Sequence, residues 1–478
     1  MRQHLVRIAL GLAVLAFFLG YATKFYPVPF IDQLDRIIYD AHLQLTLPGG
    51  IDERIVILDI DEKSLATPGL GQWPWSRDVL AGLVEKLFDK YGVQILGFDV
   101  VFAEPDRSSA LPVLEGLATG ALKDLPQFRS ALERLRPQLD HDARFAATIK
   151  NRPVVLGYYF TRDRGALTIG ALPPPVLPRG TFTGRAVVFP PWTGYGASLP
   201  DLQAAATATG HINAFPDPDG INRRVPMLVE YKGAYYEPLA LAVMRTLLEL
   251  PKVEPGYPPP GSVLNRNYGR LEWLEVGRLR IPVDEDACVF VPYRGPKGSF
   301  PYVSLADLYL DRVEVEQLKG KIALIGTTAP ALFDLRATPV GEAYPGVEVH
   351  ANLVAGMLDG RIKAKPAYVF GAEVMLLLLL GVALAILLPL LTPLRATLVS
   401  VAALAAAVAL YLSFWENVDI ALPLASSLLM VTGLFALNMS YGFFVESRSK
   451  RQLTTRFGEY VPPELVDVMA ANPGRYSM

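Results

Sequence analysis

The sequence predicts an α/β domain with a mixed, mostly parallel sheet, together with four membrane-spanning helices, one N-terminal and three C-terminal. Two observations predict this architecture. The mean hydropathy of +0.28 is high for a soluble chain, and the apolar excess is concentrated near the N-terminus and at about residues 367–445. Between these regions, residues 51–365 alternate strand-like and helix-like patterns, which is typical of βαβ units.

Four apolar segments are long enough to cross a bilayer. Residues 5–22 form the first, and residues 367–388, 396–414 and 420–444 form the others. Each is close to the ~20 residues that a transmembrane helix requires. The first segment has an alternative interpretation as a cleaved signal peptide. Residues 22–25 (Ala-Thr-Lys-Phe) are a poor cleavage site, which favours an uncleaved anchor.

The positively charged residues next to the spans predict the orientation, because cytoplasmic loops are enriched in Lys and Arg. These residues are Arg2, Arg7, Arg395, Arg448, Lys450, Arg451 and Arg456. They predict a multi-pass protein of the inner (plasma) membrane with both termini, residues 1–4 and 446–478, in the cytoplasm. Residues 28–365 are then extracytoplasmic.

Charge and cysteine content exclude some classes of protein. The formal net charge is −2, and no dense basic run lies outside the membrane flanks, so no nucleic-acid partner is expected. The single cysteine, Cys288, cannot form an intrachain disulfide or a zinc cluster. Its strand-like surroundings, residues 287–291, predict a small buried side chain; a bridge to another chain is the alternative.

The elements of the outer domain follow from apolar periodicity. Buried-strand patterns occupy residues 54–61, 92–101, 153–160 and 321–326. Helical patterns occupy residues 77–91, 141–150, 237–250 and 346–358. Residues 104–138 are expected to form an inserted helical region, residues 166–193 a loop and residues 269–291 two or three antiparallel strands.

Polar side chains follow three of the predicted strands at their carboxyl ends, where ligands bind in open α/β sheets. These candidates for ligand binding are Asp59, Asp61, Ser64, Asp99, Glu104, Thr327, Thr328 and Asp334. The alternative is that they only cap the helices that follow the strands.

A second polar group lies in residues 210–220, with His211 and Asn213 as further ligand-binding candidates. The Asp-x-Asp-Gly run at Asp217 is similar to a calcium loop but lacks the later Glu of an EF-hand, so a tight turn is favoured. His350 opens the last helix and is also a candidate. Its pairing with His211 around a metal ion is an alternative interpretation, and no metal site is assigned.

Several motifs lie along the outer domain in a distinctive order. They are Asp59–Ser64, Trp73–Arg77, Gly97–Asp99, Gly210–Asn213, Pro216–Arg224, Ile325–Thr328 and Pro345–Asn352. These motifs resemble the second type of CHASE domain, the cyclase- and histidine-kinase-associated sensory extracellular regions. The match covers about residues 30–360, and one span before and three after are also similar to this family. The resemblance implies an extracytoplasmic sensor.

The C-terminal residues 456–466 and 472–474 resemble the linker that opens a class III adenylate or guanylate cyclase domain. The resemblance implies a receptor that controls cyclic nucleotide synthesis and acts as a parallel homodimer. Residues 1–478 lack the cyclase's metal-binding aspartate motif. Two Mg or Mn ions, and ATP or GTP, are therefore expected only in a catalytic domain absent from this sequence. The alternatives are a stand-alone non-enzymatic membrane sensor, the receptor part of a kinase, and an extracytoplasmic enzyme.

Overall fold

The computed structural model describes residues 2–163, 165, 167–185, 187, 189–258, 270–332, 334–366 and 368–457. The chain divides into two compact units. Residues 1–38 and 368–478 form the first, which we call the helical unit. Residues 39–367 form the second, which we call the α/β unit.

In its described residues, the helical unit contains four helices that are long and apolar enough to span a membrane, one N-terminal and three C-terminal, as predicted. Its elements are α1 (Arg2–Ala22), α2 (Pro29–Leu45, which continues into the α/β unit), α12 (Tyr368–Leu387), η5 (Leu388–Leu390), α13 (Pro393–Asn417) and α14 (Ala425–Phe457). The membrane-spanning windows are His4–Ala22, Tyr368–Leu390, Pro393–Asn417 and Ala425–Phe444. The sequence analysis missed α2, which follows α1 after a short connection.

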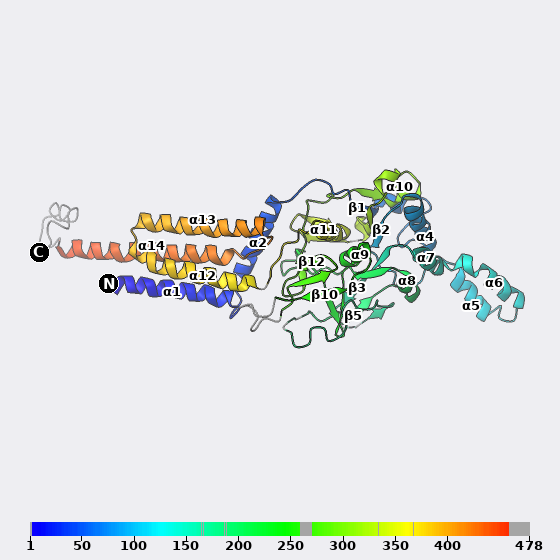
Figure 1. Ribbon diagram of the computed structural model, residues 1–478, viewed down its shortest axis with the longest axis horizontal. Helices are drawn as coiled ribbons and strands as arrows, with labels where there is room; N and C mark the ends of the chain where they lie inside the picture. The colour runs from blue at the N-terminus through cyan, green and yellow to red at the C-terminus, as the bar shows by residue number, and fades with distance from the viewer. Residues whose placement is uncertain are drawn as a thin grey trace. The chain divides into compact units, whose positions relative to one another are not determined.

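Apolar side chains hold the helical unit together. Helix α1 contacts α12 and α14, and α13 contacts α14, so the helices lie side by side (Figure 1). Leu15, Leu377 and Leu434 belong to one buried cluster. Two polar contacts join the helices: Ser426 Oγ donates to Glu373 Oε1 over 2.6 Å, and Asn438 Nδ2 donates to the Leu388 carbonyl over 2.9 Å.

A mixed, mostly parallel sheet forms the centre of the α/β unit and confirms the predicted fold class. Six parallel strands lie in the order β14 (Tyr302–Ser304), β1 (Ile55–Ile60), β15 (Ile322–Thr327), β2 (Ile95–Phe98), β3 (Val154–Thr161) and β6 (Ala208–His211). Beyond β3, β5 (Gly194–Gly196) pairs antiparallel with it, and β4 (Thr168–Ile169) pairs parallel with β5. Every residue of β1 is buried, as expected for a central strand covered on both faces.

Helices cover both faces of this sheet, because successive strand residues point to opposite sides. Leu96 and Phe98 of β2 join a large apolar cluster, to which helices on one face contribute. These helices are α3 (Glu62–Ala66), α4 (Arg77–Glu85) with η1 (Lys86–Lys90), α7 (His141–Ile149), α8 (Pro200–Ala205) and α10 (Leu305–Tyr309). On the other face, α9 (Leu239–Leu247) packs on β2, β3 and β6, and α11 (Gly346–Asp359) packs on β1 and β15.

Smaller elements complete the α/β unit. Three antiparallel strands form a meander: β10 (Val253–Gly256), β11 (Trp273–Val276) and β12 (Leu279–Pro282). Six further strands form antiparallel pairs. The pairs are β7 (Arg224–Pro226) with β13 (Cys288–Phe290), β8 (Val229–Tyr231) with β9 (Ala234–Tyr236), and β16 (Leu335–Thr338) with β17 (Gly341–Pro345). The short helices η3 (Val315–Gln317) and η4 (Pro330–Leu332) flank β15 in the chain.

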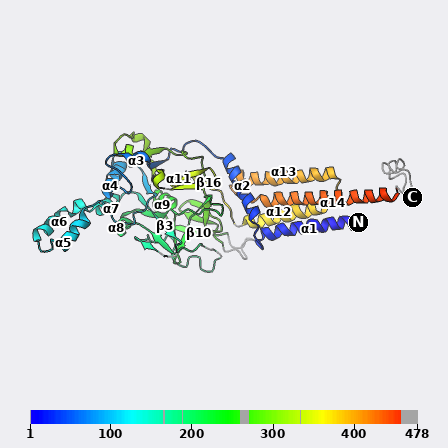
Figure 2. The ribbon, with the colours of Figure 1, turned by 180° about the vertical axis from the view of Figure 1, so that it is seen from behind.

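The predicted inserted region is helical, and the cysteine is buried. Helices α5 (Leu111–Thr119) and α6 (Pro126–Leu139) form the insertion, and together they project from the rest of the α/β unit (Figures 1 and 2). Cys288 lies in β13, is buried and is free. The β16–β17 hairpin, which the sequence analysis did not predict, follows β15.

Close packing between β6 and α9 requires glycine at position 210. A Cβ atom there would lie 2.4 Å from the Leu239 backbone nitrogen, and backbone cannot move aside cheaply. We expect Gly210→Ala to lower the free energy of unfolding by about 1–3 kcal/mol, measured by denaturant unfolding of the full chain in detergent. Gly82→Ala in α4 is the matched control, because no heavy atom lies within 4 Å of its added Cβ; an equal loss in both variants would contradict the argument.

Candidate functional site

The polar residues that follow β1 are held by internal hydrogen bonds. Asp59 is 7% exposed, and its carboxylate accepts from Thr328 N over 2.9 Å and from Thr328 Oγ1 over 2.6 Å. Burial raises the pKa of Asp59, and the two hydrogen bonds from Thr328 oppose that shift. The Asp59–Thr328 hydrogen bonds therefore connect β1 to the segment that follows β15.

Asp61 and Ser64 act as a helix cap. Asp61 is the N-cap of α3, and its Oδ1 accepts from Ser64 N over 2.8 Å and from Ser64 Oγ over 2.6 Å. The same oxygen accepts from Ser304 Oγ over 2.9 Å, which ties the cap to β14. This is the capping interpretation that the sequence left open.

Three further candidates also make local contacts. Thr327 Oγ1 donates to the Ile60 carbonyl over 3.0 Å. Glu104 is exposed and pairs with Arg107 over 2.7 Å. Asn213 forms two 2.8 Å hydrogen bonds with the backbone N–H and carbonyl of Phe160, so its amide fixes the end of β3.

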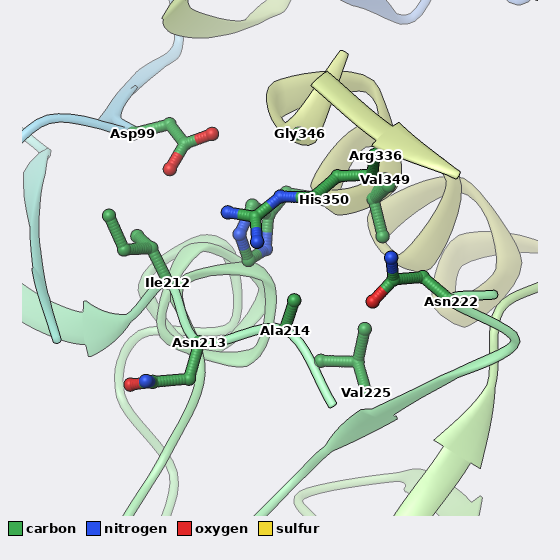
Figure 3. A pocket seen from close by; sticks show the side chains of 10 residues that line it. All are labelled: Asp99, Ile212, Asn213, Ala214, Asn222, Val225, Arg336, Gly346, Val349 and His350. Carbon is green, nitrogen blue, oxygen red and sulfur yellow. The ribbon is translucent and has the colours of Figure 1, made fainter. Parts of the chain in front are cut away.

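Asp99 and His350, by contrast, line a small internal cavity. Its volume is about 20 Å³, roughly the space of one water molecule. Figure 3 shows Asp99, Arg336 and His350 pointing towards this space, whereas the Asn213 side chain points away. The lining residues are Asp99, Ile212, Asn213, Ala214, Asn222, Val225, Arg336, Gly346, Val349 and His350.

Several buried polar atoms of the residues that line the cavity make no hydrogen bond with the described part of the chain. These buried atoms are Asp99 Oδ2, Asn222 Oδ1 and His350 Nδ1. Arg336 Nη2 donates to Asp334 Oδ1 over 2.9 Å, so the predicted candidate Asp334 pairs with a cavity residue but does not itself line the cavity. Because buried polar groups are normally satisfied, these atoms are suited to bind a small polar ligand or an ordered water.

Burial dominates the electrostatics of the cavity. It raises the pKa of Asp99 well above its usual range, Asp334 raises it further, and Arg336 opposes the shift. Burial also lowers the pKa of His350 to about 3, with Arg336 as the second cause. Both side chains are therefore held towards their neutral forms.

His211 lies at the end of β6 and is fully buried. Neither ring nitrogen has a hydrogen-bond partner among the described residues. Burial, and then the proximity of His350, lower its pKa to about 3. The structure thus brings the two histidines close enough for His350 to lower the pKa of His211. Within the described ranges, however, no three His, Cys, Asp or Glu side chains are arranged to hold a metal ion.

The Asp-x-Asp-Gly turn binds arginine side chains. Arg223 Nη1 donates to Asp217 Oδ2 and Asp219 Oδ1, both over 2.9 Å. Arg224 Nη2 donates to Asp217 Oδ1 over 3.0 Å, and its Nη1 donates to Asp284 Oδ2 over 2.6 Å. Guanidinium groups therefore supply the positive charge that a calcium loop would take from the metal.

The sequence analysis missed the polar cavity residues Arg336 and Asn222. Arg336 lies on the unpredicted strand β16, and no motif marked it. Asn222 directly follows the turn residues 217–220, and its Nδ2 donates to the Ala337 carbonyl over 3.1 Å. The sequence feature nearest to Asn222 was the tight turn predicted at residues 217–220.

Removing the charge of Asp99 tests the effect of its burial. Since the folded-state pKa is raised, the ionised carboxylate destabilises the folded state at neutral pH. We expect Asp99→Asn to raise the free energy of unfolding by about 1 kcal/mol at pH 7, measured on the full chain in detergent. The gain should shrink on acidification, as the wild-type carboxyl takes up a proton. The exposed Glu254→Gln serves as control; a lower stability of Asp99→Asn at pH 7 would contradict the argument.

Comparison with known proteins gives one match. The CHASE2 domain family model matches residues 9–388, which include most of α1, the α/β unit and α12. The CHASE2 domain is an extracytoplasmic sensor domain of signalling proteins, so the resemblance found in the sequence motifs is confirmed for the sensor domain. No curated protein and no solved structure is significantly similar to the chain.

Proposed function

The chain belongs to the CHASE2 domain family, and on that premise we propose that it is the receptor part of a class III adenylate or guanylate cyclase. It resides in the inner (plasma) membrane with both termini in the cytoplasm. An extracytoplasmic signal acts on the α/β unit, and the response is a change in cyclic nucleotide synthesis by a catalytic domain that follows the last span.

The main support for the proposal is that α14 is one continuous helix, Ala425–Phe457. Its apolar stretch ends at Val445, before the largely charged run 446–451, whereas the helix continues to Phe457. At 1.5 Å per residue, the additional turns extend α14 well beyond the bilayer. The start of α1 and the end of α14 lie at the same end of the helical unit (Figure 1). A shift at the outer end of α14 is therefore transmitted to whatever follows Phe457.

The tail supports a cyclase as the output. Residues 458–478, which include most of the cyclase-like linker, lie outside the described residues, so this support comes from the sequence alone. A class III catalytic domain forms its sites between two subunits, which is why we propose a parallel homodimer. Such a domain would bind two Mg or Mn ions, which would activate the ribose hydroxyl and stabilise the leaving pyrophosphate. ATP or GTP is bound only there.

We place the signal site at the Asp99 cavity. Asp99, His350 and His211 combine burial, perturbed pKa values and atoms with free hydrogen-bonding capacity, which are typical of functional sites. Asp59, Asp61 and Ser64, in contrast, satisfy one another and their neighbours, so we assign them a structural role.

The reading frame after the codon for Met478 tests the output. We expect an in-frame cyclase domain. Membranes that contain the extended protein should then make cyclic AMP or cyclic GMP from the matching nucleotide with Mg or Mn. Membranes that contain residues 1–478 alone are the control and should make neither.

Two outcomes favour the competing functions. A stop codon directly after Met478 would support a stand-alone sensor, and a downstream kinase domain with phosphoryl-transfer activity would support a kinase receptor. Cysteine crosslinking in membranes tests the homodimer separately: exclusive recovery of monomer would contradict it. An extracytoplasmic enzyme would require turnover by the α/β unit in a broad hydrolase screen of the full chain.

A further inference from the structure

Helix α2, up to Ile38, has two different faces. Ile31, which is 2% exposed, belongs to the buried cluster of the helical unit, and Leu34 and Ile38 pack against that cluster. On the adjoining side of the helix, Phe30 is 64% exposed and Ile37 is 55% exposed. Positions 30 and 37 are seven residues apart and so lie on one face of a helix. This part of α2 therefore presents apolar side chains, next to its buried face, that the described chain leaves uncovered.

Polar contacts place α2 at the ends of two spans. Tyr21, near the end of α1, donates its hydroxyl to Asp32 Oδ1 over 2.6 Å. Asp35 Oδ1 accepts from the backbone N–H groups of Leu424 and Ala425, each over 2.8 Å. Since α14 begins at Ala425, Asp35 caps this helix from a neighbouring one and complements its dipole.

These contacts fix the depth of α2 relative to a bilayer. Helices α1 and α14 cross the apolar core, so the end of the first and the start of the second lie where that core meets water. Figures 1 and 2 show that α2 runs across this end of the helical unit. A helix that lies across the ends of the spans, with apolar side chains on its free face, has the arrangement of an interfacial amphipathic helix.

We propose that α2 is a membrane-interface helix whose free face, Phe30 and Ile37, together with the preceding Phe25, contacts the outer leaflet of the bilayer. Phe25 is 86% exposed and lies in the connection between α1 and α2. The leaflet is the outer one because the extracytoplasmic domain follows α2 in the chain. The partner is a lipid surface, and the inference does not depend on which output domain follows α14.

A second copy of the chain fits this face less well. Phe30 and Ile37 form a narrow stripe with the polar Gln33 between them, whereas stable protein interfaces bury roughly 800 Å² on each partner. The lipid interface needs no matching surface and is continuous with the spans that α2 crosses. Contact with lipid removes these side chains from water, which is favourable by about 25 cal/mol per Å² of apolar surface.

Depth-dependent fluorescence quenching tests the proposal on the full chain in nanodiscs. Phe30→Cys and Ile37→Cys are each labelled with an environment-sensitive fluorophore; the wild type, whose one cysteine is buried, gives the background. The probe is phosphatidylcholine brominated either near the headgroup end or near the terminal methyl of its acyl chains. Val113→Cys is the matched control, because Val113 is 68% exposed and lies on α5 of the extracytoplasmic domain.

We expect the shallow bromines to quench the labels at positions 30 and 37 at least about twofold more than the label at position 113, and more than the deep bromines do. Quenching equal to that of the Val113→Cys control would overturn the proposal. Excimer emission from pyrene at position 30, without quenching by brominated lipid, would also overturn it, because a second copy would then cover this face.

Discussion

The variant Arg223→Met is expected to lower the free energy of unfolding of the α/β unit by about 3–5 kcal/mol, the usual cost of removing one partner from a buried ion pair. The Arg223 side chain is only 3% exposed, so water cannot replace the lost charge. Hydrogen exchange of β13, which pairs with β7 directly after Arg223, measures the loss in the full chain in nanodiscs.

The size of this effect follows from three carboxylates that share one guanidinium. Arg223 Nε and Nη2 donate to the two oxygens of Asp40 over 2.6 and 2.7 Å. Its Nη1 donates to Asp217, and both Nη1 and Nη2 donate to Asp219. Burial lowers the pKa of Arg223, but these hydrogen bonds outweigh burial and raise it. Methionine would leave the carboxylates of Asp40 and Asp219 without this cation.

Two variants separate charge from geometry. Arg223→Lys keeps the charge but cannot form two parallel hydrogen bonds to Asp40, so an intermediate loss is expected. Arg107→Met removes the exposed partner of Glu104 and should change the stability by less than about 1 kcal/mol. A loss for Arg223→Met no larger than that of Arg107→Met would show that the cluster contributes little to stability.

The sequence predicted those parts of the fold that depend on hydrophobic patterning. The buried runs of β1 and β15 and the four apolar spans have strong periodic or continuous signals. The β16–β17 hairpin was missed because it has no periodic signal. Helix α2 was missed although residues 29–45 have an amphipathic pattern, with Ile31, Leu34 and Ile38 at helical spacing. Its tertiary partner could not be predicted, because no local pattern indicates that Asp35 bonds with residues 424 and 425.

The candidate site was predicted only in part for the same reason. The ends of parallel strands meet at one edge of a sheet, so Asp99 could be singled out, whereas His211 was noted only for the polar run in which it lies. The strand-end rule does not distinguish a ligand-binding carboxylate from a capping one. Asp61 has the sequence context of a ligand-binding residue, but the hydroxyls of Ser64 and Ser304 occupy it. Arg336 comes from a hairpin that has no periodic signal.

Acidification from pH 7.5 to pH 5 is expected to destabilise the α/β unit through His211 and His350. Burial lowers both pKa values from 6.5 to about 3. The unfolded chain therefore binds protons below pH 6.5 that the folded unit does not bind until about pH 3. The free energy of unfolding decreases as the pH is lowered through that interval. At pH 5 the cost is roughly 2 kcal/mol for each histidine, at 1.36 kcal/mol per pH unit.

Buried carboxyls with raised pKa values act in the opposite direction, so the test must compare variants at each pH. Burial raises the pKa of Asp99, and it raises that of Glu237 to about 7 against the opposing effect of Arg245. Both groups therefore favour the folded state as the pH falls.

We expect His350→Gln and His211→Gln each to reduce the loss of unfolding free energy between pH 7.5 and pH 5 by roughly 2 kcal/mol, measured by hydrogen exchange of β6 in the full chain. The control is the partly exposed His141→Gln. If His350→Gln and His141→Gln kept the pH dependence of the wild type, the buried histidines would not be linked to acid destabilisation.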